Sequence, residues 1–412
     1  MTKKASTPAL RFKGFTYTWE QRKLSEFADK VTEKNVGLQY IETFTNSAEF
    51  GIISQRDFFD HDIAKMSSLG GYYIVRSEDF VYNPRISTSA PVGPINRNKL
   101  GRIGVMSPLY TVFRPHDIGT TYLEHFFKSK YWHSFMNFNG DSGARSDRFS
   151  IKDSVFFEMP IPIPHIEEQR KIGEYLTHLD RLITLHQRKY DKLTNMKKSM
   201  LEKMFPNNGA NVPEIRFKGF TDAWEQRKLG ECTDLLTGHP FESKQFSENG
   251  VLLIRGMNVK RNELDTSPEI CEYWHTTEGL EKYLLSADDI LIQMDGALIG
   301  KSYAKMPKNK LPALLVQRVT RARTKNDYDN DFIYQSLQRD FLTYIQGIKT
   351  ETAVPHLSLN DIFIFKIYVP SLAEQKKIGS CFRNLDNLIT LHQRELEKLK
   401  NLKKACLEKM FV

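Results

Sequence analysis

The feature that most constrains the fold is a segment of 39 residues that occurs twice. The first copy, at 167–205, reads EEQRKIGEYLTHLDRLITLHQRKYDKLTNMKKSMLEKMF, and the second, at 373–411, reads AEQKKIGSCFRNLDNLITLHQRELEKLKNLKKACLEKMF. They align without gaps and share 24 of 39 residues. A shorter pair precedes them, RFKGFTYTWEQRKL at 11–24 and RFKGFTDAWEQRKL at 216–229. The chain of 412 residues is therefore one unit of about 205 residues written twice, a period too long for a solenoid.

Both long copies carry the spacing of a coiled coil. Apolar residues recur every seven positions with charges between them, and prolines stand just before each copy. A helix of this length reaches about 55 Å. Two seams of equal length in one chain most simply pair with each other, antiparallel if the units are related by a twofold-like rotation. The residues expected to pair the helices are Ile172, Leu176, Leu179, Ile183, His186, Leu193, Ile378, Phe382, Leu385, Ile389, His392 and Leu399.

The regions between the repeated segments differ in sequence but share a pattern. SEDFVYNPR at 77–85 resembles ADDILIQMD at 287–295, and helical stretches follow at 121–136 and 331–345. Short strands with a helix predict a mixed α+β domain in each half. The predicted fold class is α+β, with two such domains separated by a pair of long antiparallel coiled-coil helices in a pseudo-twofold duplication. The predicted boundaries are 1–160 for the first domain, 161–210 for the first helix and linker, 211–369 for the second domain and 370–412 for the second helix.

Composition narrows the class of protein. The formal net charge of +9 slightly favours an anionic partner such as DNA or RNA. The four cysteines are widely spaced, which is typical of reduced thiols and predicts no disulfide framework and no metal site. The start of the chain lacks the apolar stretch of a secretion signal, and no apolar run approaches the roughly 18 residues of a membrane span, so we expect a cytoplasmic protein.

No catalytic constellation is evident. The stretch from Gly296 to Ser302 resembles a phosphate-binding loop, but one residue is missing between its glycine and the Gly-Lys pair. Asp295 stands where the first glycine is needed, so a strand-turn-strand is expected there instead. Asn83-Pro84-Arg85 holds only half of the Asn-Pro-Pro-aromatic motif of amino-methyltransferases. The sequence predicts no enzyme and no catalytic residue.

Cationic, amide and aromatic residues gather in predicted loops and at strand ends. Arg and Lys can bind phosphates or guanine edges, and Asn and Gln can pair with adenine. Asn83 and Gln293 occupy matching positions after equivalent strands, so both are candidate base readers. The polar loops at 139–148 and 346–356 could face DNA or be plain connectors. The residues expected to contact DNA are Tyr82, Asn83, Arg85, Arg97, Lys99, Arg102, Arg145, Arg148, Arg255, Asn258, Lys260, Gln293, Lys301, Arg318, Lys349 and His356.

The duplicated WEQRKL segment, the divergent domains and the two Glu-Gln-basic-basic-Ile helix starts resemble the specificity subunits of type I restriction-modification systems. The resemblance covers essentially the whole chain. It implies two target recognition domains, each reading one half of a split, asymmetric site in double-stranded DNA. It also implies helices that space the halves and dock two methyltransferase subunits, with restriction subunits joining the complex. S-adenosylmethionine, ATP and Mg would belong to the partner subunits, and this chain would bind no cofactor.

Two other readings stay open at this point. The chain could be an enzyme that modifies DNA by itself, which cofactor binding would reveal. It could also be a coiled-coil scaffold that binds no DNA, which a failure to bind any duplex would favour.

Overall fold

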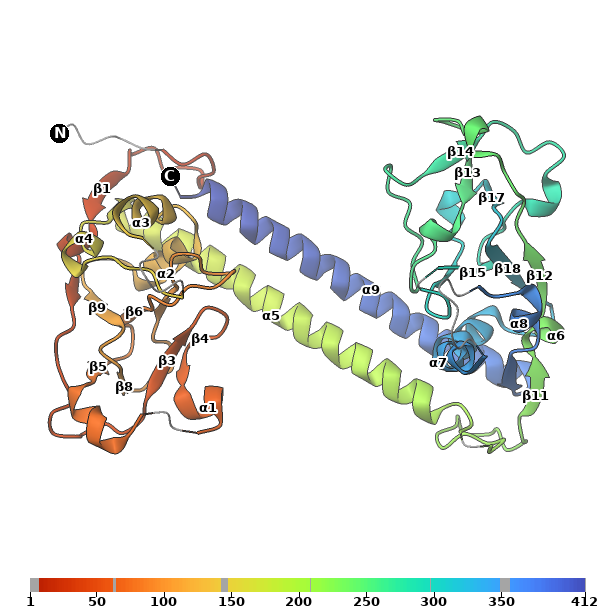
Figure 1. Cartoon of the computed structure of the whole chain (residues 1–412), viewed down its shortest axis with the longest axis horizontal. Coiled ribbons are helices and arrows are strands. Elements are labelled where there is room, and N and C mark those ends of the chain that lie inside the picture. The colour runs from red at the N-terminus through yellow and green to blue at the C-terminus, as the bar shows by residue number, and fades with distance from the viewer. Residues whose placement is uncertain are drawn as a thin grey trace. The chain divides into compact units, whose positions relative to one another are not determined.

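The computed structural model describes residues 7–61, 64–141, 147–207, 209–296, 298–348 and 356–411. The chain divides into two compact units, which we call unit 1, Met1–Gln187 with Arg394–Val412, and unit 2, Arg188–Gln393. Each is a mixture of sheets and helices, as Figure 1 shows element by element. The predicted α+β class is confirmed.

Unit 1 is built on a four-stranded antiparallel sheet in the order β2-β9-β6-β7, with the two-stranded sheets β1-β10, β3-β4 and β5-β8. Its core gathers aromatic side chains, including Trp19, Phe80, Phe113 and Phe126. The strands and helices are β1 Glu20–Lys23, η1 Leu24–Glu26, β2 Ala28–Lys30, β3 Phe44–Ser47, β4 Gly51–Ser54, α1 Gln55–Phe59, η2 Met66–Gly71, β5 Tyr73–Val75, β6 Phe80–Tyr82, β7 Ile95–Arg97, β8 Gly104–Met106, β9 Thr111–Pro115, α2 Thr120–Lys128, α3 His133–Asn139, α4 Asp153–Phe156, β10 Pro160–Ile163 and α5 Ile166–Lys203.

Unit 2 repeats this plan, with a four-stranded sheet in the order β12-β18-β15-β16, a three-stranded sheet β14-β13-β17 and the pair β11-β19. Its core includes Trp224, Phe332, Phe341 and Phe382. The elements are β11 Glu225–Lys228, α6 Leu229–Cys232, β12 Thr233–Thr237, η3 Ser243–Gln245, β13 Val251–Ile254, η4 Gly256–Asn258, β14 Glu272–Trp274, η5 Glu281–Tyr283, β15 Ile290–Gln293, β16 Tyr303–Lys305, η6 Lys308–Lys310, β17 Ala313–Leu315, β18 Val319–Thr324, α7 Asn330–Ile348, α8 Leu359–Phe363, β19 Lys366–Val369 and α9 Leu372–Lys409.

The turn before each central strand explains the paired acids seen in the sequence. The first acid has a left-handed backbone, with φ of 72° at Glu78 and 67° at Asp288. The second acid is buried and accepts hydrogen bonds from an arginine on the neighbouring strand, so Asp79 binds Arg114 and Asp289 binds Arg323. The shared pattern thus sets β6 and β15 in equivalent places. The predicted alignment of 77–85 with 287–295 is confirmed.

One predicted helix is wrong in extent. The stretch 121–136 forms two helices, α2 and α3, whereas 331–345 lies within the single helix α7. The break follows from Ser129, whose backbone is extended and whose Oγ donates to the carbonyl of Phe126 at 2.6 Å. The indole of Trp132 then donates to the carbonyl of Phe127 at 3.0 Å and starts the second helix in a new direction.

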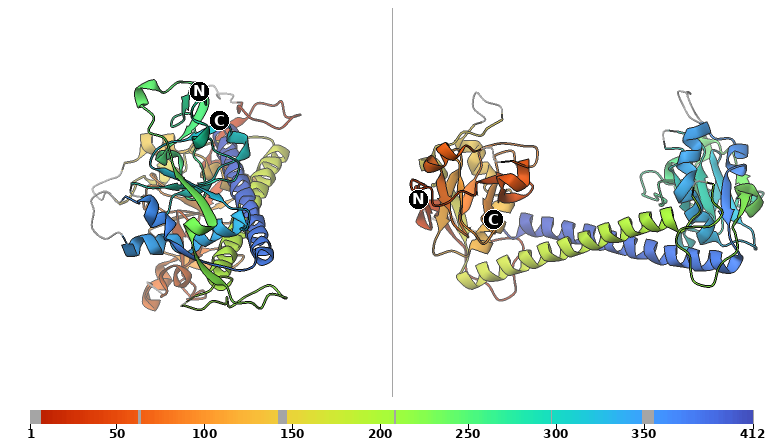
Figure 2. Two further views of the ribbon diagram at one scale, coloured as in Figure 1. Left: turned by 90° about the vertical axis from the view of Figure 1, so that its right-hand side faces the viewer. Right: turned by 90° about the horizontal axis from the view of Figure 1, so that it is seen from below.

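The long helices α5 and α9 match the repeated segments within one or two residues at each end. They pack together, and within each unit their parts run side by side in opposite directions (Figure 1 and Figure 2). The seam residues nearest the helix starts, Ile172, Leu176 and Leu179 in α5 and Ile378, Phe382 and Leu385 in α9, are buried, four of them less than 2 % exposed. The others are half-buried: Ile183, His186, Leu193, Ile389, His392 and Leu399.

The Glu-Gln pair at each helix start locks that helix to its domain. Glu168 is fully buried, and its carboxylate accepts from the Arg11 guanidinium at 2.7 and 2.8 Å and from the Trp19 indole at 3.1 Å. Gln169 accepts from the backbone N–H of Gly119, at the start of α2, at 2.9 Å. In unit 2 the same contacts join Glu374 to Arg216 and Gln375 to the N–H of Asp329, before α7.

The glycine four residues further on permits this close approach. A Cβ at Gly173 would lie 3.0 Å from Thr121, and one at Gly379 would lie 2.2 Å from the Asp329 carboxylate. Such distances are too short for any larger side chain without displacement of the neighbouring helix. The repeated Glu-Gln-basic-basic-Ile-Gly sequence is therefore explained by helix docking.

The Met-Phe end of each long helix completes the aromatic core of a unit. In unit 2, Phe205 stacks on Phe332, with ring centroids 5.4 Å apart. In unit 1, Phe411 contacts Tyr122 and Phe126. Each unit is thus closed by the helix end that the other sequence repeat supplies.

We expect Glu168→Ala to lower the free energy of unfolding by about 3–5 kcal/mol, because it leaves a largely buried guanidinium without its partner. Glu374→Ala should cost about 1 kcal/mol less, since Trp224, unlike Trp19, donates no hydrogen bond to the carboxylate. Denaturant unfolding measures both. The exposed neighbour Glu167→Ala is the control, expected within about 0.5 kcal/mol of the parent. Equal losses of stability in all three variants would contradict a stabilising role for the buried ion pairs of Glu168 and Glu374.

Candidate nucleic-acid interface

The two units share a backbone frame just beyond the central strand of each four-stranded sheet. In unit 1, the N–H of Phe149 donates to the carbonyl of Pro84 at 2.7 Å, and Arg85 and Arg148 form an antiparallel bridge. In unit 2, the N–H of Leu357 donates to the carbonyl of Met294 at 2.7 Å. Asp295 and His356 form the matching bridge. Residues 85 and 148 in one unit therefore correspond to 295 and 356 in the other.

A third position joins this frame from the neighbouring strand. Tyr82 of β6 is paired with Thr111 of β9, as Ile292 of β15 is paired with Thr320 of β18. The residues two places before those partners are Leu109 and Arg318. Both are exposed, Leu109 by 41 % and the Arg318 side chain by 66 %. We call these three places in each unit the strand-end positions: 85, 109 and 148 in unit 1, and 295, 318 and 356 in unit 2.

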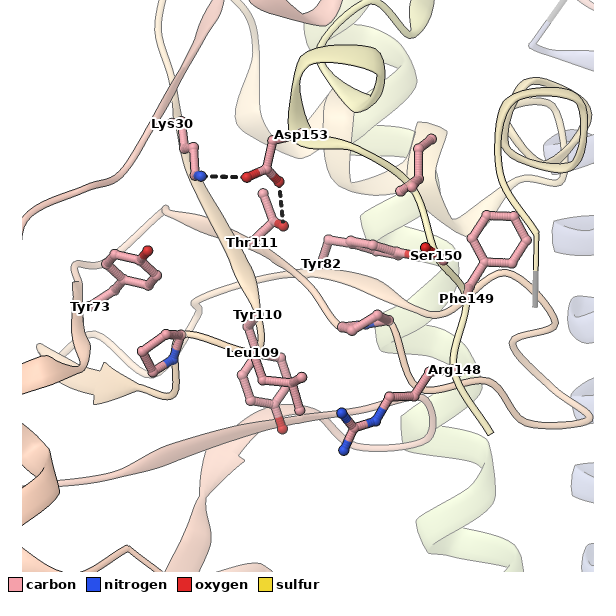
Figure 3. Close-up of a pocket in the computed structure, with 13 residues that line it drawn as sticks. Lys30, Tyr73, Tyr82, Leu109, Tyr110, Thr111, Arg148, Phe149, Ser150 and Asp153 are labelled. Atoms are coloured by element: carbon pink, nitrogen blue, oxygen red, sulfur yellow. Dashed lines mark hydrogen bonds and ion pairs between the residues drawn. The ribbon is translucent and has the colours of Figure 1, made fainter. Parts of the chain in front are cut away.

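In unit 1 two of the strand-end positions, 109 and 148, line an open cavity of about 540 Å³. The ion pair of Lys30 and Asp153 lies at one end, and Thr111 donates to Asp153 at 3.1 Å. The guanidinium of Arg148 points toward Tyr110 and Leu109 at the opposite end (Figure 3). An arginine beside a half-buried tyrosine and an exposed leucine can contact a base edge, a phosphate or a base plane.

In unit 2 the same positions carry a different set of groups. Arg318 donates to the Asp295 carboxylate at 2.8 Å, and His356 is exposed beside them. Gln293, at the end of β15, lies against Gly256, where a Cβ would come within 3.3 Å of its amide nitrogen. Within the described ranges, its side-chain amide forms no hydrogen bond. The structure therefore brings together Gln293, Arg318 and His356 from the predicted set.

Four predicted contact residues are satisfied inside the protein instead. Tyr82 is 3 % exposed, its hydroxyl donates to the Val92 carbonyl, and burial raises its pKa. The Asn83 amide donates to the carbonyl of Asn46 at 2.7 Å and accepts from the N–H of Arg85 at 3.0 Å. Asn258 is fully buried and donates to the Asp265 carbonyl. Arg255 is half-buried and donates to the Ile270 carbonyl at 2.6 Å. Contact with a base would require these groups to give up their internal partners.

Three predicted cations in unit 1 are neutralised by carboxylates. Arg97 pairs with Glu78 and Glu124, and Lys99 also pairs with Glu124. Burial by itself would raise the pKa of the Glu124 carboxyl, but Lys128, Lys99 and Arg97 outweigh it and lower the pKa to about 2. Arg102 forms a two-pronged pair with Glu42. These pairs hold strands and helix α2 together and leave little net positive charge there.

The other predicted residues are placed as follows. Arg85 is exposed and lies 4.0 Å from the Asp147 carboxylate. Lys260 is half-buried, and Lys301 is exposed. Arg145 and Lys349 lie outside the described residues. Strand pairing adds two residues that the sequence prediction missed, Leu109 and Asp295, since their position depends on the register between β6 and β9 and between β15 and β18.

The rejected phosphate-binding loop is indeed a turn between two antiparallel strands, β15 and β16, with φ of 91° at Gly296 and 74° at Gly300. In the parts of the chain that the structure describes, no three His, Cys, Asp or Glu side chains gather as a metal site would require. Of the described helices, none is both long and apolar enough to cross a membrane.

A family model described as the type I restriction modification DNA specificity domain matches the chain twice, at residues 17–195 and 221–401. The chain belongs to this family of type I DNA specificity proteins. Each specificity domain contains one set of strand-end positions and one long helix. The repeat seen in the sequence is therefore a repeat of the whole domain.

Two similar proteins are themselves specificity subunits, in agreement with the family match. The chain is 28 % identical over 269 residues to the type I restriction enzyme MjaVIII specificity subunit of Methanocaldococcus jannaschii, a match that covers 62 % of this chain and 61 % of that protein. It is 28 % identical over 202 residues to the EcoAI specificity subunit of Escherichia coli, covering 48 % and 34 %. The matches thus span less than two thirds of these relatives.

A crystal structure of the type I restriction-modification S subunit from M. genitalium has the same fold. It aligns with a TM-score of 0.67 at 15 % identity and covers 99 % of both chains.

Asn83 and Gln293 follow equivalent strands, and substituting each in turn shows whether its side-chain amide stabilises the fold. We expect Asn83→Ala to lower the free energy of unfolding by about 1–3 kcal/mol, because it leaves buried backbone groups without partners. Gln293→Ala should change it by less than about 0.5 kcal/mol. Denaturant unfolding of both variants would settle the difference, and a larger loss for Gln293→Ala would mean that this amide is structural too.

Proposed function

We propose that this chain is the DNA-reading subunit of a type I restriction-modification complex, and that each specificity domain reads one half of a split, asymmetric site. The observation that supports this is that the two units share a backbone arrangement at the strand-end positions but differ in the side chains found there. The backbone bridge that joins 85 to 148 in unit 1 also joins 295 to 356 in unit 2. Unit 1 nevertheless presents Arg85, Leu109 and Arg148 where unit 2 presents Asp295, Arg318 and His356. One frame bearing two sets of side chains suits a protein that reads two different sequences.

Base reading at these positions is physically reasonable. Arginine can bind guanine through two hydrogen bonds, and glutamine can bind adenine in the same way. Each mismatched base pair in a site typically costs about 1–3 kcal/mol. The net charge of +9 supplies attraction to phosphates that does not depend on sequence. Among the predicted contacts, we place Arg85, Arg148, Gln293, Arg318 and His356 nearest to the bases.

The repeated segments serve partners that are the same on both halves. We infer that two methyltransferase subunits dock on the repeated helical surfaces and methylate adenine with S-adenosylmethionine. Restriction subunits, which use ATP and Mg, would join through the complex. In this proposal the chain itself is non-catalytic and binds no cofactor, and its long helices set the distance between the half-sites.

A methylome tests the proposal directly. The chain is expressed with its neighbouring methyltransferase subunit in a host that lacks adenine methylation, and modified adenines are mapped by single-molecule sequencing. We expect a split motif with a fixed gap that appears only when this chain is present. Methylation that ignores this chain would overturn the proposal, and cofactor binding by the isolated chain would favour a stand-alone enzyme. A silent genome from a verified, active complex would favour a scaffold.

Independent reading predicts that the halves can be exchanged separately. Replacing residues 1–150 with those of a relative should change one half of the methylated motif and leave the other intact, because the strand-end positions of unit 2 are untouched. A change in both halves at once would contradict independent reading.

Equivalent strand-end positions also allow a reciprocal test. We expect Arg148→His to alter base preference in one half-site and His356→Arg to alter it in the other, by about tenfold per affected position. Arg102→Ala, which removes a guanidinium that holds Glu42, is the control and should leave the motif unchanged. Uniform loss of methylation on all sites would show that residues 148 and 356 hold phosphates.

A further inference from the structure

Each long helix carries an aspartate and, 17 residues later, a lysine. They are Asp180 and Lys197 in α5, and Asp386 and Lys403 in α9. The aspartate of each helix contacts the lysine of the other. Asp180 pairs with Lys403 in unit 1, and Lys197 pairs with Asp386 at 2.6 Å in unit 2. We call these two contacts the crossed pairs.

The crossed pairs are held by helices of the domains and are partly shielded from water, the pair in unit 2 more than the pair in unit 1. Lys197 is only 9 % exposed, and its ammonium also donates to Gln338 of α7 at 2.6 Å. Gln335 of the same helix donates to Asp386 at 2.9 Å. In unit 1, Lys128 of α2 takes the equivalent place and lies 3.4 Å from Asp180. Separating the pair in unit 2 would leave the buried Lys197 ammonium without its carboxylate, which is strongly unfavourable.

The apolar seam alone does not choose one alignment of the helices. Its residues recur every seven positions, so a slip of one heptad keeps apolar groups in contact. The same slip would place Lys197 opposite Gly379 or Gln393, and Asp180 opposite Leu396 or Met410. A parallel pairing would bring aspartate toward aspartate. With an equal interval of 17 residues in both helices, both pairs form together in one antiparallel register and break together in any other.

Apolar anchors at the helix ends, such as Phe205 and Phe411, favour the same register. Apolar contacts are non-directional, however, and cores tolerate repacking. A charged pair with fixed hydrogen-bond partners is lost at once when the register changes. Single polar contacts in coiled coils are known to set register in this way, at some cost in stability.

We propose that the crossed pairs fix the register of α5 against α9 and thereby set the single spacer length that the chain accepts between its two half-sites. This rests on the proposed function above. Asp180, Lys197, Asp386 and Lys403 would then be specificity-determining residues that contact no base, since they act on the gap in the motif and not on the bases within it.

Unit 2 permits a charge-reversal test. Lys197→Glu and Asp386→Lys each bring like charges together, and each should lower the melting temperature by roughly 5–15 °C. The double variant K197E/D386K should recover the loss, because the amides of Gln335 and Gln338 can turn to serve either charge. Lys198→Glu, at the exposed neighbouring position, is the matched control and should change little. Lys197→Met with Asp386→Leu removes the pair without leaving a buried charge, so it keeps a folded variant available.

Two readouts decide the proposal. In the methyltransferase complex, we expect the single and the apolar variants to methylate sites with the same half-sites but an additional spacer length, and the reversed pair to restore one spacer. In the isolated chain, Tyr175 contacts Cys406, so Tyr175→Cys allows the register to be trapped by oxidation and mapped by peptide analysis without DNA. The yield of the disulfide between positions 175 and 406 should fall in the single charge-reversal variants and return in the double variant K197E/D386K.

The outcomes separate the two proposals. Folded single and apolar variants that keep one spacer and full trapping would overturn the register role, even if their melting temperatures fall. Altered trapping in a chain whose parent directs no split-site methylation would uphold the register role but overturn its link to DNA spacing, together with the proposed function.

Discussion

A buried carboxylate at the start of each long helix is the interaction on which the rest of the structure depends. Glu168 and Glu374 are fully buried, and a charge in that position is tolerable only if its partners are fixed. The partners are Arg11 and Arg216, which come from the short repeated segments near the start of each half. In each half, the short repeated segment supplies the arginine and the long repeated segment supplies the glutamate of this one ion pair. This explains why both segments repeat while the residues between them do not.

The same contact also fixes where the strand-end positions lie relative to the long helix of their unit. The adjacent glutamine binds the start of α2 or α7, and those helices pack on the sheets whose central strands end at the strand-end positions. A change of side chain at position 148 or 356 therefore leaves the docking of the helix unaffected. Such separation allows the side chains at the strand-end positions to vary without loss of the fold.

Helices and repeats could be predicted from the sequence because their signals are periodic and local. The heptads placed α5 and α9 within one or two residues, and the acidic turn pattern placed β6 and β15. The break at Ser129 was missed, since a single serine that bonds back to its own helix has no periodic signature. The residues available to contact DNA were harder to predict from the sequence. Nothing in the sequence distinguishes Asn83, whose amide is satisfied by Asn46 and Arg85, from Gln293, whose amide bonds to none of the residues that the structure describes.

The difference between Asn83 and Gln293 has a physical origin. An amide placed after a strand can either hold a loop or face outward, and the choice depends on backbone groups that arrive from distant parts of the chain. In unit 1, β3 supplies the carbonyl of Asn46, and the Asn83 side chain takes it. In unit 2, the longer Gln293 side chain lies against Gly256, where a Cβ would come within 3.3 Å of its amide nitrogen. Two domains with one frame can therefore place their polar groups at different depths, so residues that are equivalent in a sequence alignment can differ in burial. At the strand-end positions, Arg85, Arg318 and His356 are exposed whereas Arg148 is half-buried, so exposure has to be read from each structure position by position.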